Sequence, residues 1–301
     1  MCPDASRYPV TQFALVMRGF MMGLADLVPG VSGGTLALIL GIYNRFITAL
    51  SRIDRSFFAL VARGKLAHAW THADGGFLLS LFVGIASSFI LFSHAIDWAL
   101  VHYPSALFAS FFGLVLASLP WLYAQVSLWG VSRYLGFAAG VMVGVLVSIA
   151  VPLNMSWPVW CLLPAGFIAI SAMLLPGVSG SFLLLLFGFY GVFIEALKTL
   201  DLIALSYFGM GAALGFLVFP KWIHALLRRA YDTTLACLIG LVTGALVKLW
   251  PWHQSAELAW PALWPDEASI VSVALVFACM AVGLLVGVVL TVFTREESHG
   301  H

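Results

Sequence analysis

Long apolar segments separated by short polar ones follow one another along almost the whole chain. Their approximate ranges are 12–50, 77–97, 105–125, 134–152, 158–197, 202–219, 233–250 and 268–293. A helix needs about 20 apolar residues to cross a bilayer, and most of these segments reach that length. Because they lack the alternation of barrel strands, the pattern predicts an all-α polytopic membrane protein.

The composition narrows the functional classes further. Of the 301 residues, 62% are hydrophobic and only 9% charged, and the formal net charge is +1. A soluble domain would carry roughly 25% charged residues, and a nucleic-acid binder would need a basic surface. The chain is therefore neither a soluble enzyme nor a nucleic-acid-binding protein. Its four cysteines are widely spaced, so no disulfide framework or zinc site is indicated and no cofactor or metal is expected.

The chain contains an internal duplication. Residues 26–50, DLVPGVSGGTLALILGIYNRFITAL, align with residues 173–197, MLLPGVSGSFLLLLFGFYGVFIEAL, at a constant offset of 147, with 14 of 25 positions identical. A weaker echo links GLVLASL at 113–119 with GLVTGAL at 240–246. Leucine-rich helices resemble one another by chance, but a shared Pro-Gly-Val-Ser-Gly does not arise in that way.

The duplicated segments are expected to be broken helical hairpins. Segments 12–50 and 158–197 are too long for one helix, and Pro-Gly with further glycines interrupts both. The alternative is that Pro-Gly merely turns two ordinary spanning helices at the far surface. Irregular backbone at membrane depth survives only inside protein or beside a wet cavity, so re-entrant tips would mark a functional site.

Basic residues indicate the topology. Lys and Arg gather in 51–76, 126–133, 220–232 and the C-terminal tail, whereas 98–104, 153–157 and 251–267 contain none. Basic loops are cytoplasmic as a rule, so both termini are expected inside and the two hairpins enter from opposite faces. This gives an inverted repeat: 1–152 holds hairpin 12–50 and spans 77–97, 105–125 and 134–152, and 153–301 holds hairpin 158–197 and spans 202–219, 233–250 and 268–293. Many secondary transporters share this plan.

The tips of the hairpins suit an anion. Ser32 and Ser179 are placed as N-caps of the helices that follow, and glycine lets the backbone approach a ligand. A helix N-terminus that opens from such a loop offers free N–H groups and the positive end of a dipole. The pattern therefore predicts a phosphate-type site at the paired tips.

Ionisable residues inside apolar segments are functional candidates by default. We expect Arg18 to bind phosphate, because arginine stays charged and forks onto phosphate oxygens. Asp26, three residues before Pro29, is expected to couple or gate transport, as are Arg45 and Glu195. Arg45 is also the second candidate for binding the phosphate. Alternatively Asp26 only caps freed N–H groups, while Arg45, Glu195, Lys198 and Lys248 extend to the membrane interface.

The motifs GLADLVPGVSGGTLALILGIY and SAMLLPGVSGSFLLLLFGFY resemble those of the PopT-type undecaprenyl-phosphate translocases, and the likeness covers nearly the whole chain. It implies a flippase that returns undecaprenyl phosphate from the outer to the inner leaflet of the bacterial cytoplasmic membrane, for carrier recycling in peptidoglycan and cell-envelope synthesis. The matching positions are Asp26, the first tip (Pro29, Gly30, Val31, Ser32, Gly33, Gly34, Thr35) and the second tip (Pro176, Gly177, Val178, Ser179, Gly180, Ser181). Where the family often has an acidic residue after Gly-x-Tyr, this chain has Asn44 and Gly191.

Two other functions stay open. The first is a polyprenyl-pyrophosphate phosphatase, but Gly33 and Gly180 stand where its Pro-Gly-x-Ser-Arg-Ser motif has arginine, and phosphoryl transfer needs such charge neutralisation. The second is a transporter or channel for a soluble anion. The expected partners are the polyprenyl-phosphate lipid and the membrane, with a homodimer as an option that the sequence leaves open.

We predict that 51–76 and 220–232 are cytoplasmic and that 251–267 faces outside. Single cysteines in each loop of a cysteine-free variant would be treated with a membrane-impermeant thiol reagent in intact cells. We expect labelling only in 251–267, because that loop lacks the basic residues that hold a loop inside. Labelling of 51–76 from outside would contradict the inverted arrangement.

Overall fold

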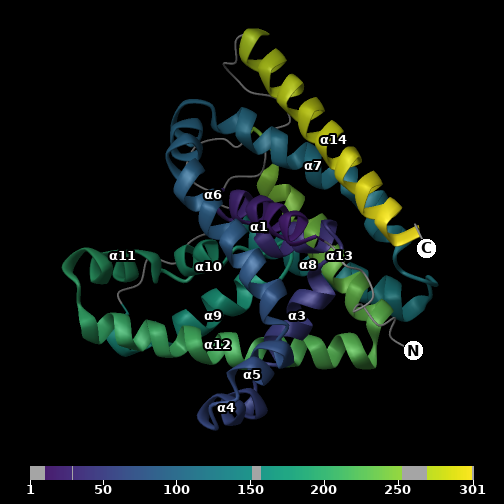
Figure 1. The fold of residues 1–301 in the computed structure, drawn as a ribbon. Coiled ribbons are helices and arrows are strands. Elements are labelled where there is room, and N and C mark those ends of the chain that lie inside the picture. The colour runs from purple at the N-terminus through teal and green to yellow at the C-terminus, as the bar shows by residue number, and fades with distance from the viewer. Residues whose placement is uncertain (1–10, 29, 151–156, 253–269, 300–301) are drawn as a thin grey trace.

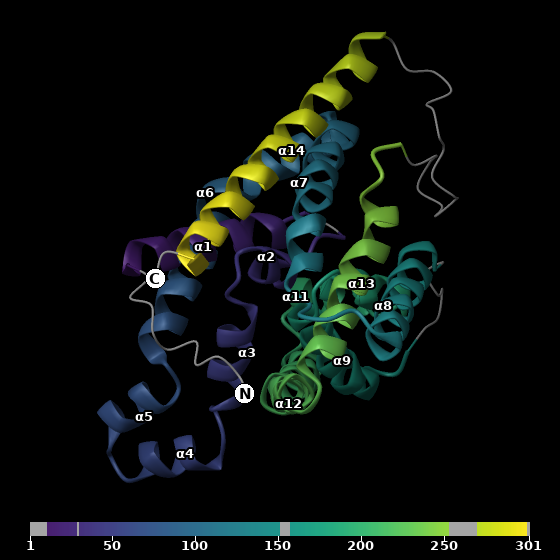
Figure 2. The same cartoon turned by 90° about the vertical axis from the view of Figure 1, so that its right-hand side faces the viewer.

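The computed structural model describes residues 11–28, 30–150, 157–252 and 270–299, and these are helical throughout, joined by turns and short loops. Figures 1 and 2 show the arrangement from two directions. The helices of the first half are α1 (Gln12–Asp26), α2 (Gly33–Ile39), α3 (Tyr43–Ser51), α4 (Arg55–Ala62), α5 (Leu66–His72), α6 (Gly75–His102), α7 (Pro104–Ala124) and α8 (Val131–Ile149). The second half has a short 3-10 turn, η2 (Val159–Cys161), then α9 (Leu162–Leu174), α10 (Gly180–Leu186), α11 (Tyr190–Thr199), α12 (Leu202–Arg229), α13 (Tyr231–Leu249) and α14 (Ile270–His299).

Several helices begin at a polar side chain that accepts a free backbone N–H. The Thr11 hydroxyl accepts from Ala14 at the start of α1, and the Asp54 carboxylate accepts from Phe57 at the start of α4. Asp201 accepts from two N–H groups at the start of α12. These contacts satisfy donors that a helix cannot bond within itself.

Six of the described helices are long and apolar enough to cross a membrane, namely α6, α7, α8, α12, α13 and residues 273–294 of α14. Two further pairs pass the same test together but are sharply bent, α2 with α3 by 119° and α10 with α11 by 107°. Counting each bent pair as one span would give eight. The expectation of an all-α, multi-pass membrane protein is therefore confirmed.

Some predicted boundaries are wrong. The expected loops 98–104 and 220–232 are almost entirely helical, because α6 continues to His102 and α12 to Arg229, through Pro220. Loop 51–76 contains α4 and α5. Pro29 and most of the predicted external loop 251–267 lie outside the described residues, so their placement stays a prediction.

Each duplicated segment is broken twice. The first break separates α1 from α2 at residues 27–32, which we call tip 1, and α9 from α10 at residues 175–179, which we call tip 2. Both tips contain a glycine at positive φ, Gly30 at 90° and Gly177 at 81°. The second break has Gly41 at 69° and Gly188 at 76°. Only glycine adopts such angles without strain, so the backbone repeats with the same offset as the sequence.

The helices pack in four main pairs, α1 with α6, α9 with α12, α7 with α14 and α8 with α13. The first pair belongs to the first half and the second to the second half, whereas the other two join the halves. Figures 1 and 2 both show α14 lying along α7. The two halves therefore pack against each other, and the division into repeats 1–152 and 153–301 stays a prediction. The orientation of the two halves relative to a membrane stays a prediction.

Glycines bring the paired helices into backbone contact. A Cβ built on Gly84 of α6 would lie 2.0 Å from the carbonyl oxygen of Val16 in α1, and one on Gly211 of α12 would lie 1.8 Å from that of Leu163 in α9. The pairs between the halves show the same feature at Gly140, Gly240, Gly113 and Gly283. Because hydrocarbon exerts no hydrophobic force between helices, close packing of small residues holds such pairs together.

The first hairpin lies at the centre of the main core. All residues of α2 are buried, as are Val28 and Val31 of tip 1. The corresponding helix α10 is partly open, since Ser181 and Leu185 are exposed. The two copies of the duplicated segment therefore occupy different environments.

We predict that Gly211→Ala destabilises the protein, although alanine favours a helix by about 1 kcal/mol over glycine. Its methyl group would meet the backbone of Leu163 and force α12 away from α9. Gly209→Ala is the matched control, because nothing lies within 4 Å of its Cβ position in the same helix. Thermal unfolding in detergent should show a lower Tm for Gly211→Ala only. Equal Tm values would contradict the role of this glycine.

Candidate functional site

Hydrogen bonds join the first hairpin to the second. The Ser32 hydroxyl lies 3.1 Å from the carbonyl oxygen of Leu175 and 3.4 Å from that of Met173. The Gly177 N–H donates to the Thr35 hydroxyl at 2.8 Å, and the buried Tyr43 hydroxyl donates to the Leu174 carbonyl at 3.1 Å. We call this set of contacts the tip junction. It brings together two segments that sequence analysis proposed to act as a pair.

The two serines at the tips behave differently. Ser32 caps α2 as expected, because its hydroxyl accepts from the Gly34 N–H at 3.2 Å. Ser179 stands at the N-cap position of α10 but makes no such bond. Its hydroxyl instead lies 3.0 Å from that of Ser181. Tip 2 therefore presents a pair of hydroxyl groups where tip 1 has a closed cap.

Asp26 is the last residue of α1, and its side chain reaches the start of α2. Its carboxylate accepts a hydrogen bond from the Gly33 N–H at 2.6 Å. A Cβ on Gly33 would come within 2.5 Å of the same carboxylate, so glycine is required for this contact. The contact fits the alternative considered for Asp26, that it caps freed N–H groups instead of coupling transport. A negative charge also suits the positive end of the α2 dipole.

The side chains that bond across the tip junction all come from the first copy. At the offset of 147, Asp26 corresponds to Met173 and Thr35 to Phe182. The first copy therefore supplies the side chains and the second supplies mainly backbone groups. The duplicated motif is symmetric in sequence, but its bonding is not.

The other predicted site residues lie away from the junction or at its margin. Arg45 forms a two-pronged ion pair with Asp74 at 2.8 and 3.2 Å and stacks over the Phe77 ring at 4.4 Å. Glu195 is exposed on α11. Arg18 is half-buried on α1, eight residues before Asp26, which corresponds to about 12 Å of helix rise. The roles expected for these three residues stay predictions.

Lys248 was not among the predicted site residues, yet it lies at the junction. Its aliphatic chain lies against Gly30 of tip 1, and its ammonium lies 4.3 Å from the ring centroid of Phe182 in α10. Sequence analysis had it extending to the membrane interface. The signal that could have found it is an ionisable residue in an apolar segment, but its two partners, Gly30 and Phe182, are distant in the chain.

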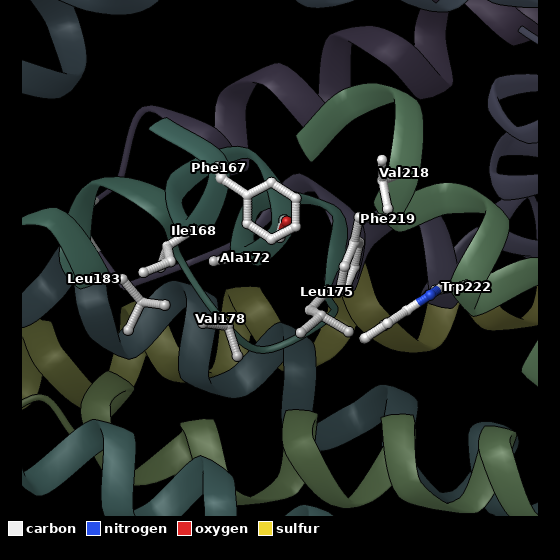
Figure 3. Close-up of a pocket in the computed structure, with 10 residues that line it drawn as sticks. Phe167, Ile168, Ala172, Leu175, Val178, Leu183, Val218, Phe219 and Trp222 are labelled. Carbon is white, nitrogen blue, oxygen red and sulfur yellow. The ribbon is translucent and has the colours of Figure 1, made fainter. Parts of the chain in front are cut away.

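An apolar cavity of about 250 Å³ adjoins tip 2. Figure 3 shows Leu175 and Val178 of the tip on one side, with Phe167 of α9 and Trp222 of α12 around the same space. The remaining lining residues are Ile168, Ser171, Ala172, Leu183, Val218 and Phe219. The side chain of Trp222 at its rim is 69% exposed. The cavity offers a hydrocarbon-like surface next to the hydroxyl pair of tip 2.

The fold and the junction define a multi-pass membrane protein in which two similar, broken helical segments are bonded to each other at their tips. The family model described as VCA0040-like, undecaprenyl phosphate translocase-like, matches residues 22–263. This is well over half of the chain, which therefore belongs to that family. The resemblance inferred from the two tip motifs is confirmed.

Two curated relatives are both named polyprenyl-phosphate transporter. The protein of Vibrio cholerae serotype O1 is 40% identical over 244 residues, covering 81% of this chain and 79% of the relative. The protein of Staphylococcus aureus is 32% identical over 269 residues, covering 81% of this chain and 88% of the relative. No solved structure matches significantly.

We predict that Thr35→Val weakens the tip junction. Valine has nearly the same shape but leaves the half-buried Gly177 N–H without its acceptor, and a buried unsatisfied donor costs about 1–3 kcal/mol. Thr291→Val is the control, because that buried hydroxyl bonds only within its own helix, to Val288. Hydrogen exchange at the Gly177 amide and the Tm would be measured for both. Unchanged exchange and Tm in Thr35→Val would show that the bond is dispensable.

Proposed function

We propose that the chain moves a polyprenyl phosphate, undecaprenyl phosphate in particular, from the outer to the inner leaflet of the bacterial cytoplasmic membrane. The observation that carries this proposal is the tip junction, where two broken segments meet amid apolar helices. A lipid phosphate has an anionic headgroup that must cross hydrocarbon, while its chain can stay in lipid. The names of the two relatives support the same substrate class.

Tip 2 is the better candidate for the headgroup in this conformation. The Asp26 carboxylate already accepts the Gly33 N–H beside tip 1, and an anion there would be repelled. Tip 2 instead offers the hydroxyls of Ser179 and Ser181, and Ser181 is exposed. Hydroxyl groups donate to phosphate oxygens without bringing a charge of their own.

The cavity beside tip 2 favours a lipid over a soluble anion. All but one of its lining residues are apolar, and Leu175 and Val178 belong to the tip itself. An isoprenoid chain can lie on such a surface without leaving apolar surroundings, whereas a soluble anion would lose its hydration there. We assign the first part of the lipid chain to this cavity.

The proposed cycle is alternating access by an inverted repeat. Matching helix pairs, α1 with α6 and α9 with α12, support a common origin of the halves. Opposite orientation would let the junction open to one leaflet and then to the other. Arg18, on α1, is assigned to attract the phosphate before it reaches the tips, and Arg45 and Glu195 to gating.

Reconstitution tests the proposed function. Purified protein in vesicles would receive C55 polyprenyl phosphate in one leaflet, and leaflet exchange and phosphate release would be measured together. We expect exchange without release. Release of inorganic phosphate would favour the phosphatase, and transport of a soluble anion without lipid exchange would favour the second alternative.

We predict that in the same assay Arg18→Ala loses most of the lipid exchange and Arg18→Lys only part of it. Lysine keeps the positive charge but lacks the two-pronged guanidinium that binds two phosphate oxygens. Normal exchange in Arg18→Ala with loss in Arg45→Ala would transfer the role to Arg45.

We predict that Asp26→Asn distinguishes a role of Asp26 in pH-dependent transport from a role in capping α2. Asparagine keeps an oxygen that can accept from Gly33 but cannot change its charge. The variant should fold and bind lipid phosphate, yet its exchange rate should no longer depend on pH. The measurement is the exchange rate across a pH series, with Tm as the check on folding. A wild-type pH profile in a correctly folded variant would leave Asp26 with the capping role alone.

A further inference from the structure

Lys248 connects the two halves of the molecule at the tips. It lies in the last turn of α13 and is half-buried. A Cβ built on Gly30 would meet the Lys248 chain at 2.9 Å from Cγ and 3.6 Å from Cε. The ammonium nitrogen reaches across to the ring of Phe182, one residue after Ser181. The side chain therefore touches tip 1 with its stem and the helix after tip 2 with its charge.

The charge of Lys248 is not neutralised in this conformation. Within the part of the chain that the structure describes, no carboxylate lies within ion-pair distance of it. The face of an aromatic ring attracts an ammonium, but it carries no net charge. Ionisable groups in such surroundings are normally paired, so the Lys248 ammonium is able to bind an anion.

The other cations near the hairpins are engaged or distant. Arg45 is paired with Asp74, and Lys198 and Lys221 are exposed on α11 and α12. Arg18 stands two turns of α1 away from tip 1. Lys248 alone among these five places its charge against α10, over the ring of Phe182, the residue that follows Ser181.

We propose that Lys248 binds the phosphate of the polyprenyl lipid at the tip junction, and this inference rests on the proposed function. The ring of Phe182 holds the ammonium while the site is empty of lipid. When a phosphate reaches the hydroxyls of Ser179 and Ser181, the ammonium moves from the ring to the phosphate oxygens. Because the Lys248 stem lies on Gly30, this movement couples headgroup binding at tip 2 to the conformation of tip 1.

Binding measurements with two lipids test this assignment. The purified full chain in nanodiscs would be titrated with C55 polyprenyl phosphate and with C55 polyprenol, which lacks the phosphate. Lys248→Met keeps the length of the side chain and removes the charge, and Lys248→Arg keeps the charge. Lys221→Met is the matched control on an exposed site.

We expect Lys248→Met to weaken binding of the phosphate lipid about 10- to 100-fold, the range typical of losing a bond to a charged group. Its affinity for polyprenol should not change, Lys248→Arg should keep most of the affinity, and Lys221→Met should equal the wild type. Wild-type affinity for the phosphate lipid in Lys248→Met would overturn the inference and leave the proposed function intact. A wild type that does not distinguish the two lipids would overturn the proposed function and this inference with it.

A second measurement avoids substitution altogether, in case Lys248→Met does not fold. Wild-type protein would be treated with an amine-reactive reagent, and modification of each lysine would be followed by mass spectrometry. C55 polyprenyl phosphate should protect Lys248 but not Lys221, and polyprenol should protect neither. Equal modification of Lys248 with and without the phosphate lipid would overturn the inference.

Discussion

The rest of the structure depends on one requirement, that backbone groups freed at a helix break must be bonded inside the protein. In hydrocarbon no water replaces the missing partner. At tip 1 the Asp26 carboxylate and the Ser32 hydroxyl take the free N–H groups of α2, and Thr35 takes that of Gly177 at tip 2. The last of these bonds requires the two broken segments to meet, and their meeting fits the complete burial of α2.

This requirement also explains why the two copies have diverged. Thr35 and Ser32 bond the backbone of the second copy, where Phe182 stands in place of Thr35 and Ser179, the equivalent of Ser32, caps no helix. The first copy has become the structural one, buried at the centre of the core. The second copy keeps exposed hydroxyls beside an apolar cavity. Under the proposed function, the first copy supports the junction and the second binds the lipid.

Much of the fold could be predicted from the sequence, because apolar length and Pro-Gly act locally. Six long helices and both tips appear where the pattern placed them, and the glycines at positive φ repeat with the predicted offset. The extra break at Gly41 and the continuation of α12 through Pro220 were missed, since neighbouring helices decide whether a glycine or a proline ends a helix. Lys248 was missed for the same reason, because nothing within its own segment indicates Gly30 or Phe182 as neighbours.

The pairing of α7 with α14 and of α8 with α13 has a consequence for how the chain is made. A ribosome adds about 5–20 residues per second, and α7 ends at Ala124 while α14 begins at Ile270. The main partner of α7 therefore emerges on the order of ten seconds or more after α7 itself. During that interval α7 lacks the helix against which Gly113 packs in the finished structure. Assembly of this protein is thus a late event in its synthesis, completed when the last helix enters the membrane.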